Sequence, residues 1–280
     1  MGIRIICDSA SDITREVAKE LNIKVLPIKT IFGEDEYLDG VNLSHKEFFE
    51  KLEESDNLPT TSQITPYDYE EAFKEAVESG DTVVCITMSS KLSGCNQSAN
   101  IAAADYLENV FVVDSENVCI GEQILVKLAV NLRDEGKTAS EIAEILDKEK
   151  KNIRLIAILD TLEYLKKGGR ISSTAAFAGT LLGIKPLVAV EDGTVVSVGK
   201  ARGLKSGNNT INKLIEKEGG IDSNKPSMLA YSGLSDEMLK KYIDGSKDIY
   251  EYVPSITTIG CAIGTHAGPG AIAVAFFKNN

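Results

Sequence analysis

The chain has 280 residues, of which 43% are hydrophobic and 26% are charged, as in an ordinary globular protein. Single cores stop growing near about 250–300 residues, so we expect two domains. The net charge of −12 argues against non-specific binding of nucleic acid or anionic lipid, which needs a basic surface. No apolar run approaches the ~18–20 residues that span a bilayer. Because Asp8 and Asp12 come too early for a signal peptide, we expect a cytoplasmic protein.

Cysteine and histidine usage narrows the chemistry. The cysteines are odd in number, widely spaced and without a CxxC pair, which predicts buried thiols and not disulfides. They are Cys7, Cys85, Cys95, Cys119 and Cys261. Only two histidines occur, His45 and His266, so a His-rich metal site is excluded by count. A carboxylate-only site for a hard cation stays open, although no EF-hand spacing occurs. We expect no metal and no cofactor.

The first 150 residues alternate between strand and helix patterns. Short runs rich in Val and Ile predict strands at Gly2–Cys7, Ile23–Ile31, Asp81–Thr87 and Asn109–Val113. Apolar residues three and four apart, mostly after a capping residue or Pro, predict helices at Asp12–Glu20, Ser44–Glu54, Pro66–Glu78, Ser93–Leu107, Val118–Asp134 and Thr138–Lys151. This alternation favours a mostly parallel sheet with helices on both faces.

The second half of the chain has more strands and fewer helices. Strands are predicted at Ile153–Leu159, Leu187–Val190, Thr194–Gly199, Ser227–Ser232, Thr257–Ile263 and Ala271–Phe277. Asp192–Gly193 is a strong hairpin signal. Helices are predicted at Ser206–Glu218 and Ser235–Gly245. The pattern predicts an α/β layer with antiparallel pairs, and we place the domain boundary so that residues 1–151 and 152–280 form the two domains.

Three loops carry candidate binding residues. Ser89–Ala99 follows a predicted strand and opens a helix, which favours either an anion site at unpaired backbone N–H groups or simple capping. Pro59–Pro66 is a hydroxyl-rich turn ahead of a predicted helix. Its hydroxyls either donate hydrogen bonds to a ligand or only cap the helix. Ile263–Gly270 is a loop between two strands, in which His266 lies among glycines and either faces a ligand or is merely exposed.

A fourth region combines basic and small apolar residues. Leu162–Ile171 predicts a short helix stopped by Gly, which accounts for its lysines but not for Arg170. The following Thr174–Leu187 predicts a tightly packed helix or the wall of an apolar tunnel. From Lys148 to Lys205 there are 11 basic and 5 acidic residues, a local charge of +6. Internal ion pairs or a docking surface would each account for this excess.

Six segments together resemble the DegV family, whose better-understood members are the fatty-acid-binding subunits of bacterial fatty acid kinase. They are DSASD at Asp8, TSQ at Thr61, SSKLSGCNQSA at Ser89, LEYLKKGGRI at Leu162, GKARG at Gly199 and IGTHAGPG at Ile263. The resemblance implies an α/β protein with two domains. The N-terminal domain has a mostly parallel sheet with flanking helices, the C-terminal domain has antiparallel strands and binds the lipid, and a long-chain fatty acid lies between them.

The resemblance also implies roles for single residues. Thr61 and Ser93 would bind the fatty acid carboxylate, the backbone N–H of Gly94 would assist, and His266 would complete the network. No residue is expected to be catalytic, because family members present the acid to a separate kinase that makes an acyl phosphate. Cys95 departs from the Thr that many members have, and Ile64 departs from a common Pro.

The resemblance further implies two partners, the long-chain fatty acid and the catalytic subunit of the kinase. We interpret Arg170, Lys200 and Arg202 as the surface that docks this kinase, with at most transient membrane contact.

Two other functions stay open. A serine hydrolase would use Ser93 as nucleophile, His266 as base and Asp160 as orienting carboxylate, although the chain lacks a GxSxG motif. A carrier of another acyl or phosphorylated metabolite would need the same kind of pocket.

Overall fold

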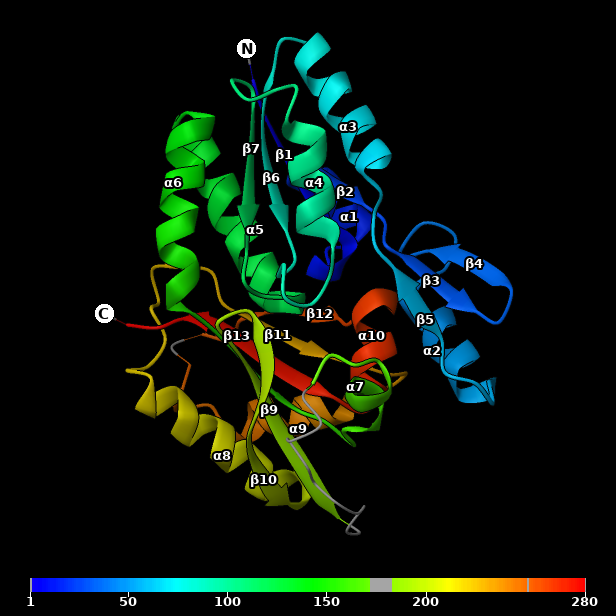
Figure 1. The fold of residues 1–280 in the computed structure, drawn as a ribbon. Coiled ribbons are helices and arrows are strands. Elements are labelled where there is room, and N and C mark those ends of the chain that lie inside the picture. The colour runs from blue at the N-terminus through cyan, green and yellow to red at the C-terminus, as the bar shows by residue number, and fades with distance from the viewer. Residues whose placement is uncertain (1, 172–182, 251, 280) are drawn as a thin grey trace.

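The computed structural model describes residues 2–171, 183–250 and 252–279. A parallel sheet from the N-terminal half and a larger mixed sheet from the C-terminal half lie one above the other in Figure 1, each flanked by helices. This α/β architecture is the predicted one. Residues 174–182 of the predicted helix or tunnel wall Thr174–Leu187 lie outside the described residues.

The N-terminal sheet has the order β2-β1-β6-β7, and all neighbouring strands are parallel. Its strands are β1 (Ile3–Asp8), β2 (Ile23–Leu26), β6 (Thr82–Thr87) and β7 (Val110–Asp114). The buried apolar runs of β1 and β6 are typical of parallel strands with both faces covered. The carboxyl ends of these strands point toward the second sheet (Figure 1), where ligands of open α/β sheets usually bind.

Helices cover both faces of this sheet. They are α1 (Arg15–Glu20), α3 (Pro66–Glu78), α4 (Cys95–Ala103), α5 (Cys119–Asp134) and α6 (Ala139–Glu149). In Figure 1, α3 and α4 pack together on one face, and α5 and α6 pack together on the other. Thr65 opens α3 and Thr138 opens α6, each through a reciprocal capping box, as the spacing Thr-Ala-Ser-Glu predicts for α6.

A small antiparallel sheet stands beside the main body. It consists of β4 (Asp35–Leu38), β3 (Lys29–Phe32) and β5 (Thr60–Ser62), with α2 (His45–Glu54) against it. The predicted single strand Ile23–Ile31 is wrong, because the chain leaves the parallel sheet after β2 and enters the small sheet at β3. Pro27 lies between the two strands and cannot donate to a ladder. The sequence analysis predicted neither β4 nor β5.

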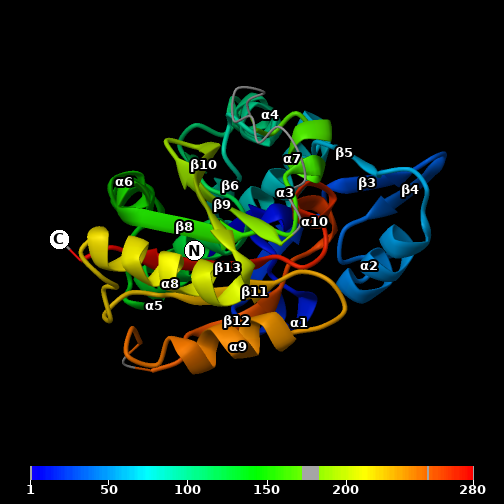
Figure 2. The ribbon, with the colours of Figure 1, turned by 90° about the horizontal axis from the view of Figure 1, so that it is seen from below.

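The second sheet has the order β10-β9-β8-β13-β11-β12. Its strands are β8 (Ile153–Ile158), β9 (Ile184–Glu191), β10 (Thr194–Arg202), β11 (Met228–Tyr231), β12 (Ser255–Thr258) and β13 (Ile272–Phe277). Only the pair β11 and β12 is parallel, so the predicted antiparallel character is confirmed. The outer face carries α8 (Gly203–Lys217) and α9 (Glu237–Gly245), as Figure 2 shows from below.

The predicted hairpin at Asp192–Gly193 joins β9 and β10, and both turn residues have positive φ, as a type I′ turn requires. Its tip contacts the N-terminal half. The hydroxyl of Ser89 donates to the carbonyl of Gly193 at 2.7 Å, and Nζ of Lys91 donates to the carbonyl of Asp192 at 2.7 Å. The hairpin thereby holds one edge of the second sheet against the loop that opens α4.

The region around His266 differs from its prediction. The strand predicted at Thr257–Ile263 ends at Thr258, and a short helix, α10 (Cys261–Ala267), replaces both its end and most of the predicted loop. The carboxylate of Asp39 accepts the backbone N–H groups of Cys261 at 3.1 Å and Ala262 at 3.0 Å. Because Asp39 is far away in sequence, this cap is tertiary and leaves no local signal.

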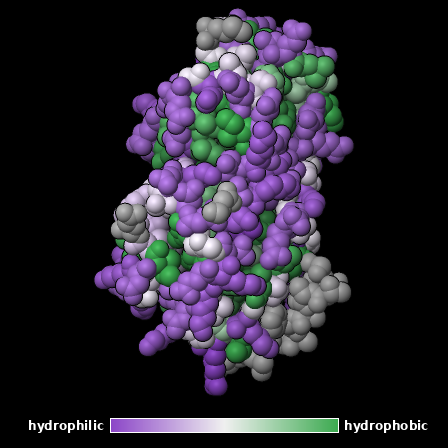
Figure 3. Space-filling model, turned by 90° about the vertical axis from the view of Figure 1, so that its left-hand side faces the viewer, coloured by the Kyte–Doolittle hydropathy of each residue, from purple (hydrophilic) through white to green (hydrophobic). Residues whose placement is uncertain are grey.

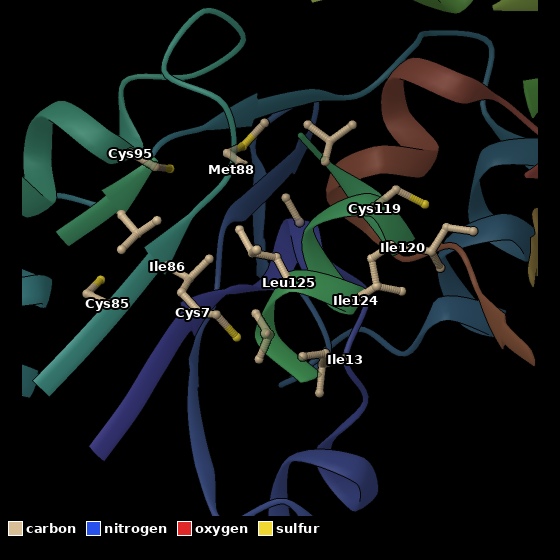
Figure 4. Packing of buried hydrophobic residues seen from close by; sticks show 14 of the residues in the cluster. Cys7, Ile13, Cys85, Ile86, Met88, Cys95, Cys119, Ile120, Ile124 and Leu125 are labelled. Atoms are coloured by element: carbon tan, nitrogen blue, oxygen red, sulfur yellow. The ribbon is translucent and has the colours of Figure 1, made fainter. Parts of the chain in front are cut away.

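The interior combines aliphatic and aromatic side chains with buried thiols. All five cysteines are free and buried, as predicted. Figure 4 shows Cys7 beside Ile86 on the side of the N-terminal sheet that faces Ile124 and Leu125 of α5, whereas Cys85, the residue before Ile86 on β6, points to the other face of the sheet. On the face that carries α6 and α8, hydrophilic residues predominate and apolar residues form separate patches (Figure 3). Within the described ranges, no helix has both the length and the apolarity needed to cross a membrane.

Helix α6 ends at Glu149, a single 3-10 turn covers Lys150–Asn152, and β8 begins at Ile153. The turn therefore falls between the last helix of the N-terminal sheet and the first strand of the second sheet. The division into residues 1–151 and 152–280 remains our proposal.

Candidate functional site

A cavity of about 340 Å³ lies between the two sheets. The N-terminal half contributes residues at the carboxyl ends of its strands and the starts of α4 and α5, among them Ala10, Met88 and Val118. The C-terminal half contributes one face of its sheet and one side of α10. The volume falls within the range of small-molecule sites.

Alternation along β8 decides which of its side chains line the cavity. On β8, Leu155 and Ala157 face the cavity, whereas Ile156 and Ile158 pack with α8 on the opposite face. Ala157 is paired with Ala273 on β13 and with Val188 on β9, so these three side chains form one row across the sheet. Two of the three are alanines, which leaves room above the sheet for an apolar ligand.

The polar end of the cavity joins Thr61 and His266, which are 205 residues apart in the chain. Thr61 lies in β5 and His266 in the last turn of α10, and Oγ1 of Thr61 is 3.2 Å from Nε2 of His266. The small sheet and α2 pack against α10 (Figure 2), which brings these two residues together. The structure thus brings the two residues together, and their role in binding a head group stays a prediction.

The imidazole of His266 is neutral near pH 7. Burial, and then the nearby Arg170 guanidinium, lower the pKa of His266 to about 4. Its Nδ1 is buried without a hydrogen-bond partner among the described residues and lies against Gly168, where a Cβ would approach it to 2.1 Å. A buried N–H without a partner costs more free energy than a buried acceptor without one, so Nδ1 of the neutral ring should carry no proton. We infer that the proton of the neutral imidazole is on Nε2. Thr61 then accepts from His266 and has its own hydroxyl proton free.

Ser93 and Gly94 form the second part of the polar end. Both line the cavity, and Gly94 is the N-cap of α4 without a side-chain capping bond. The hydroxyl of Ser93 donates to Sγ of Cys95 at 3.2 Å and accepts the Cys95 backbone N–H at 3.3 Å. A Cβ on Gly94 would come within 1.9 Å of Oε1 of Gln63, so a larger residue here would displace this amide.

Arg170 also lines the cavity, close to His266. Its Nε donates to the carbonyl of Leu92 at 3.2 Å, and its guanidinium donates to the carbonyl of Gly168 at 2.6 Å. These bonds connect the segment after α7 (Glu163–Lys167) to the loop that carries Ser93. The residue was predicted as part of a docking surface, and the structure places it at the polar end of the cavity. Lys200 and Arg202 are exposed on the edge strand β10.

The residues of the hydrolase alternative do not form a triad. His266 is bonded to Thr61, and the hydroxyl of Ser93 donates to Cys95. Asp160 is largely exposed and forms an ion pair with Lys185. Among the described residues there is also no group of three or more His, Cys, Asp and Glu side chains placed to hold a metal ion.

Two features of the site escaped the sequence analysis. Gln63 belongs to the TSQ segment, and its Nε2 donates to the hydroxyl of Ser98 at 3.0 Å, which holds it against Gly94. Ala157 and Ala273 form the open row of the sheet. The sequence does show an alanine within each of these two apolar strands. It does not show that the strands are neighbours in the sheet, so the row could not be predicted.

The fold and site define an α/β protein with an apolar cavity whose polar end carries hydroxyls, the N-cap of α4, a neutral histidine and one arginine. The family model described as "Uncharacterised protein, DegV family" matches residues 2–279. A DegV domain-containing protein of Caldanaerobacter subterraneus is 34% identical, and the match covers 98% of both chains. The chain therefore belongs to the DegV family, as its six motif segments predicted.

Two solved structures of similar fold belong to proteins that are described as binding fatty acids. A structure of a Thermus thermophilus DegV family protein, described as showing fatty acid binding, has a TM-score of 0.89 and 29% identity and covers 100% of each chain. A stearic acid-binding protein of Eubacterium ventriosum has a TM-score of 0.87 and 26% identity and covers 98% of this chain and 97% of that one. Both relatives have the same fold over essentially their whole length.

Proposed function

We propose that this protein binds a long-chain fatty acid in the cavity between its sheets. The observation that carries the proposal is an apolar cavity of about 340 Å³ whose polar end joins the Thr61–His266 pair to Ser93 and Gly94. An acyl tail of ~15 methylenes, each worth ~0.8 kcal/mol on burial, would supply on the order of 12 kcal/mol before ordering costs. The related proteins described as fatty-acid-binding support this assignment.

The head group is bound by the hydroxyls of Thr61 and Ser93 and the backbone N–H of Gly94, while neutral His266 orients Thr61. The hydroxyl of Ser93 would turn from Sγ of Cys95 to the carboxylate when the ligand binds. Hydroxyl and amide donors satisfy a carboxylate without neutralising it, so its oxygens keep their nucleophilic character. In this proposal the protein is not itself an enzyme. It presents the carboxylate to a separate cytoplasmic kinase, which forms an acyl phosphate on it.

The exposed cations Lys200 and Arg202 on β10, together with Arg170 at the cavity, would guide the kinase to the head group. Support for this docking role comes from the local charge of +6 in a chain of −12 and from the motif segment GKARG. Contact with a membrane would be transient.

Native mass spectrometry of the purified protein tests the binding proposal. We expect a bound mass equal to a long-chain fatty acid, which gas chromatography of the extracted lipid then identifies. A different acyl metabolite in the cavity would contradict the proposal, and so would a protein that binds no added palmitate. Labelling of Ser93 by a fluorophosphonate probe would instead favour the hydrolase.

A further inference from the structure

Helix α10, which carries His266, depends on side chains from the other half of the chain. It has only seven residues, and its N-cap is Gly260, which has no side chain for a capping bond. Oδ1 of Asp12 accepts the N–H of Gly260 at 2.8 Å. The two carboxylate oxygens of Asp39 accept the next two N–H groups, at 3.1 and 3.0 Å. Both aspartates are buried, which shields these bonds from water.

The small antiparallel sheet also holds the other end of α10. Asp39 directly follows β4, and its backbone N–H donates to the carbonyl of Ile28, the residue before β3. Thr61 lies on β5, on the opposite side of β3, and contacts His266 in the last turn of the helix at 3.2 Å. Helix α10 is therefore attached to one sheet at two points, by Asp39 at its first turn and by Thr61 at its last.

Packing between these two points places α10 directly against α2. A Cβ on Gly264, in the middle of the helix, would come within 2.7 Å of the Phe48 ring and 3.0 Å of the Phe49 ring. At the first turn, a Cβ on Gly260 would meet Nε2 of His45 at 2.7 Å. Because the helix backbone touches these rings, the hydrogen bonds at its two ends decide where along α2 the helix lies.

We propose that Asp39 and Asp12 are positioning residues of the head-group site. The inference rests on the proposed function. By accepting the first N–H groups of α10, the two carboxylates hold the helix so that Nε2 of His266 reaches Oγ1 of Thr61 and leaves the Thr61 hydroxyl proton free for the ligand. They act through the helix and not on the fatty acid, because neither aspartate lines the cavity.

The test variant is Asp39→Asn, which keeps the shape of the side chain but replaces one accepting oxygen by an amide group that cannot accept. The N–H of Cys261 or of Ala262 then loses its partner, and the first turn of α10 should shift. The matched control is Asp81→Asn. Asp81 also accepts a backbone N–H, that of Gly2, but it lies at the amino end of β6, whereas the cavity lies at the carboxyl ends of these strands.

The first measurement follows the ring of His266 in the ligand-free protein. Burial, and then the nearby Arg170 guanidinium, lower its pKa to about 4, and NMR titration measures this value. We expect Asp39→Asn to raise the pKa by about one unit toward that of an exposed histidine, because a shifted α10 admits water to the ring. Asp81→Asn should leave it unchanged. The chain has only two histidines, so His266→Gln assigns the signal.

The second measurement is calorimetric titration with palmitate in a double-mutant cycle. Asp39→Asn should weaken palmitate binding by about fivefold to tenfold in the wild-type background. In the Thr61→Val background, where the hydroxyl that His266 orients is absent, it should weaken binding by less than about twofold. A merely structural role of Asp39 would weaken binding equally in both backgrounds.

Equal losses in the two backgrounds, or an unchanged pKa of His266 in folded Asp39→Asn protein, would overturn the inference. If wild-type protein binds no palmitate, the proposed function fails, and the pKa of His266 still decides whether Asp39 positions the ring. If Asp39→Asn does not fold, Asp12→Gly takes its place, because the positive φ of Asp12 suits glycine and the change removes the other carboxylate. The same rise in pKa is expected there, and its absence would overturn the inference.

Discussion

At its polar end the cavity is built from β5, the start of α4 and the last turn of α10, whereas its apolar body combines one face of the second sheet with apolar residues of the N-terminal half and of α10. The geometry of the polar end depends on a few hydrogen bonds, such as the 3.2 Å contact of Thr61 with His266. These bonds form only when segments far apart in the chain pack together. The body depends on volume, and any small apolar side chain at Ala157 would preserve it. The polar end therefore sets the orientation of a ligand and part of its affinity, whereas the apolar body sets the larger part of the affinity.

The largest effect should come from filling the apolar body. Ala157→Leu combined with Ala273→Leu narrows the row that the two alanines share, and displacing about four methylenes of the tail removes about 3 kcal/mol, or more than a hundredfold in palmitate affinity. Calorimetric titration measures this loss, with thermal unfolding to check the fold. Decanoate provides the control, because a shorter tail should lose much less. Equal losses for both acids would show that this row does not contact the tail.

The next effect concerns the polar end. Thr61→Val removes a hydroxyl from the head-group site, and Ser93→Ala removes another. A hydrogen bond to a charged group is worth about 1.5–3 kcal/mol, so each variant should lose roughly tenfold or more in fatty acid affinity. Thr60→Val is the matched control, since Thr60 is exposed on the same strand. The assignment fails if both site variants bind palmitate as tightly as the control.

A smaller effect is expected outside the cavity. Arg202→Glu should slow phosphorylation of the bound acid by about tenfold and make the rate less sensitive to salt, because rim charges mainly govern encounter. Fatty acid affinity should not change. The control is Lys213→Glu, which reverses an exposed charge on α8. Loss of fatty acid binding in folded Arg202→Glu protein would place this residue in the pocket instead.

The smallest effect is a pH dependence of stability. The pKa of His266 is lowered to about 4 in the folded protein, so the unfolded chain binds the proton more readily between about pH 4 and 6.5. Stability therefore rises with pH across this window and is lost as the pH falls. Burial raises the pKa of Asp8 to about 7, which acts in the opposite direction, so total stability alone does not report on His266.

Comparison with His266→Gln isolates the histidine. Relative to this variant, wild-type protein should lose about 1 kcal/mol of unfolding free energy between about pH 7 and pH 5.5. Urea unfolding at the two pH values measures this difference. If wild-type protein and His266→Gln differ in unfolding free energy by the same amount at both pH values, His266 is not held in its neutral form.

Most elements with a strong local signal were predicted correctly. Helix α3 begins at Pro66 and ends at Glu78 as predicted, because proline at the first position and the Thr65 capping box mark its start. The hairpin at Asp192–Gly193 was also predicted, since two adjacent residues of positive φ favour this dipeptide. The predictions failed where the signal was tertiary, as at α10, whose first N–H groups are capped by Asp39.

The sequence by itself determined the family, the α/β class and the polar residue types of the site, because these follow from local patterns and from six motif segments in order. Only the tertiary structure decided that Thr61 contacts His266, that Arg170 lines the polar end of the cavity and that two alanines lie side by side on the sheet. These relations join residues far apart in the chain. They depend on which strands pair and how the two sheets meet, which nearest-neighbour patterns in a sequence do not encode.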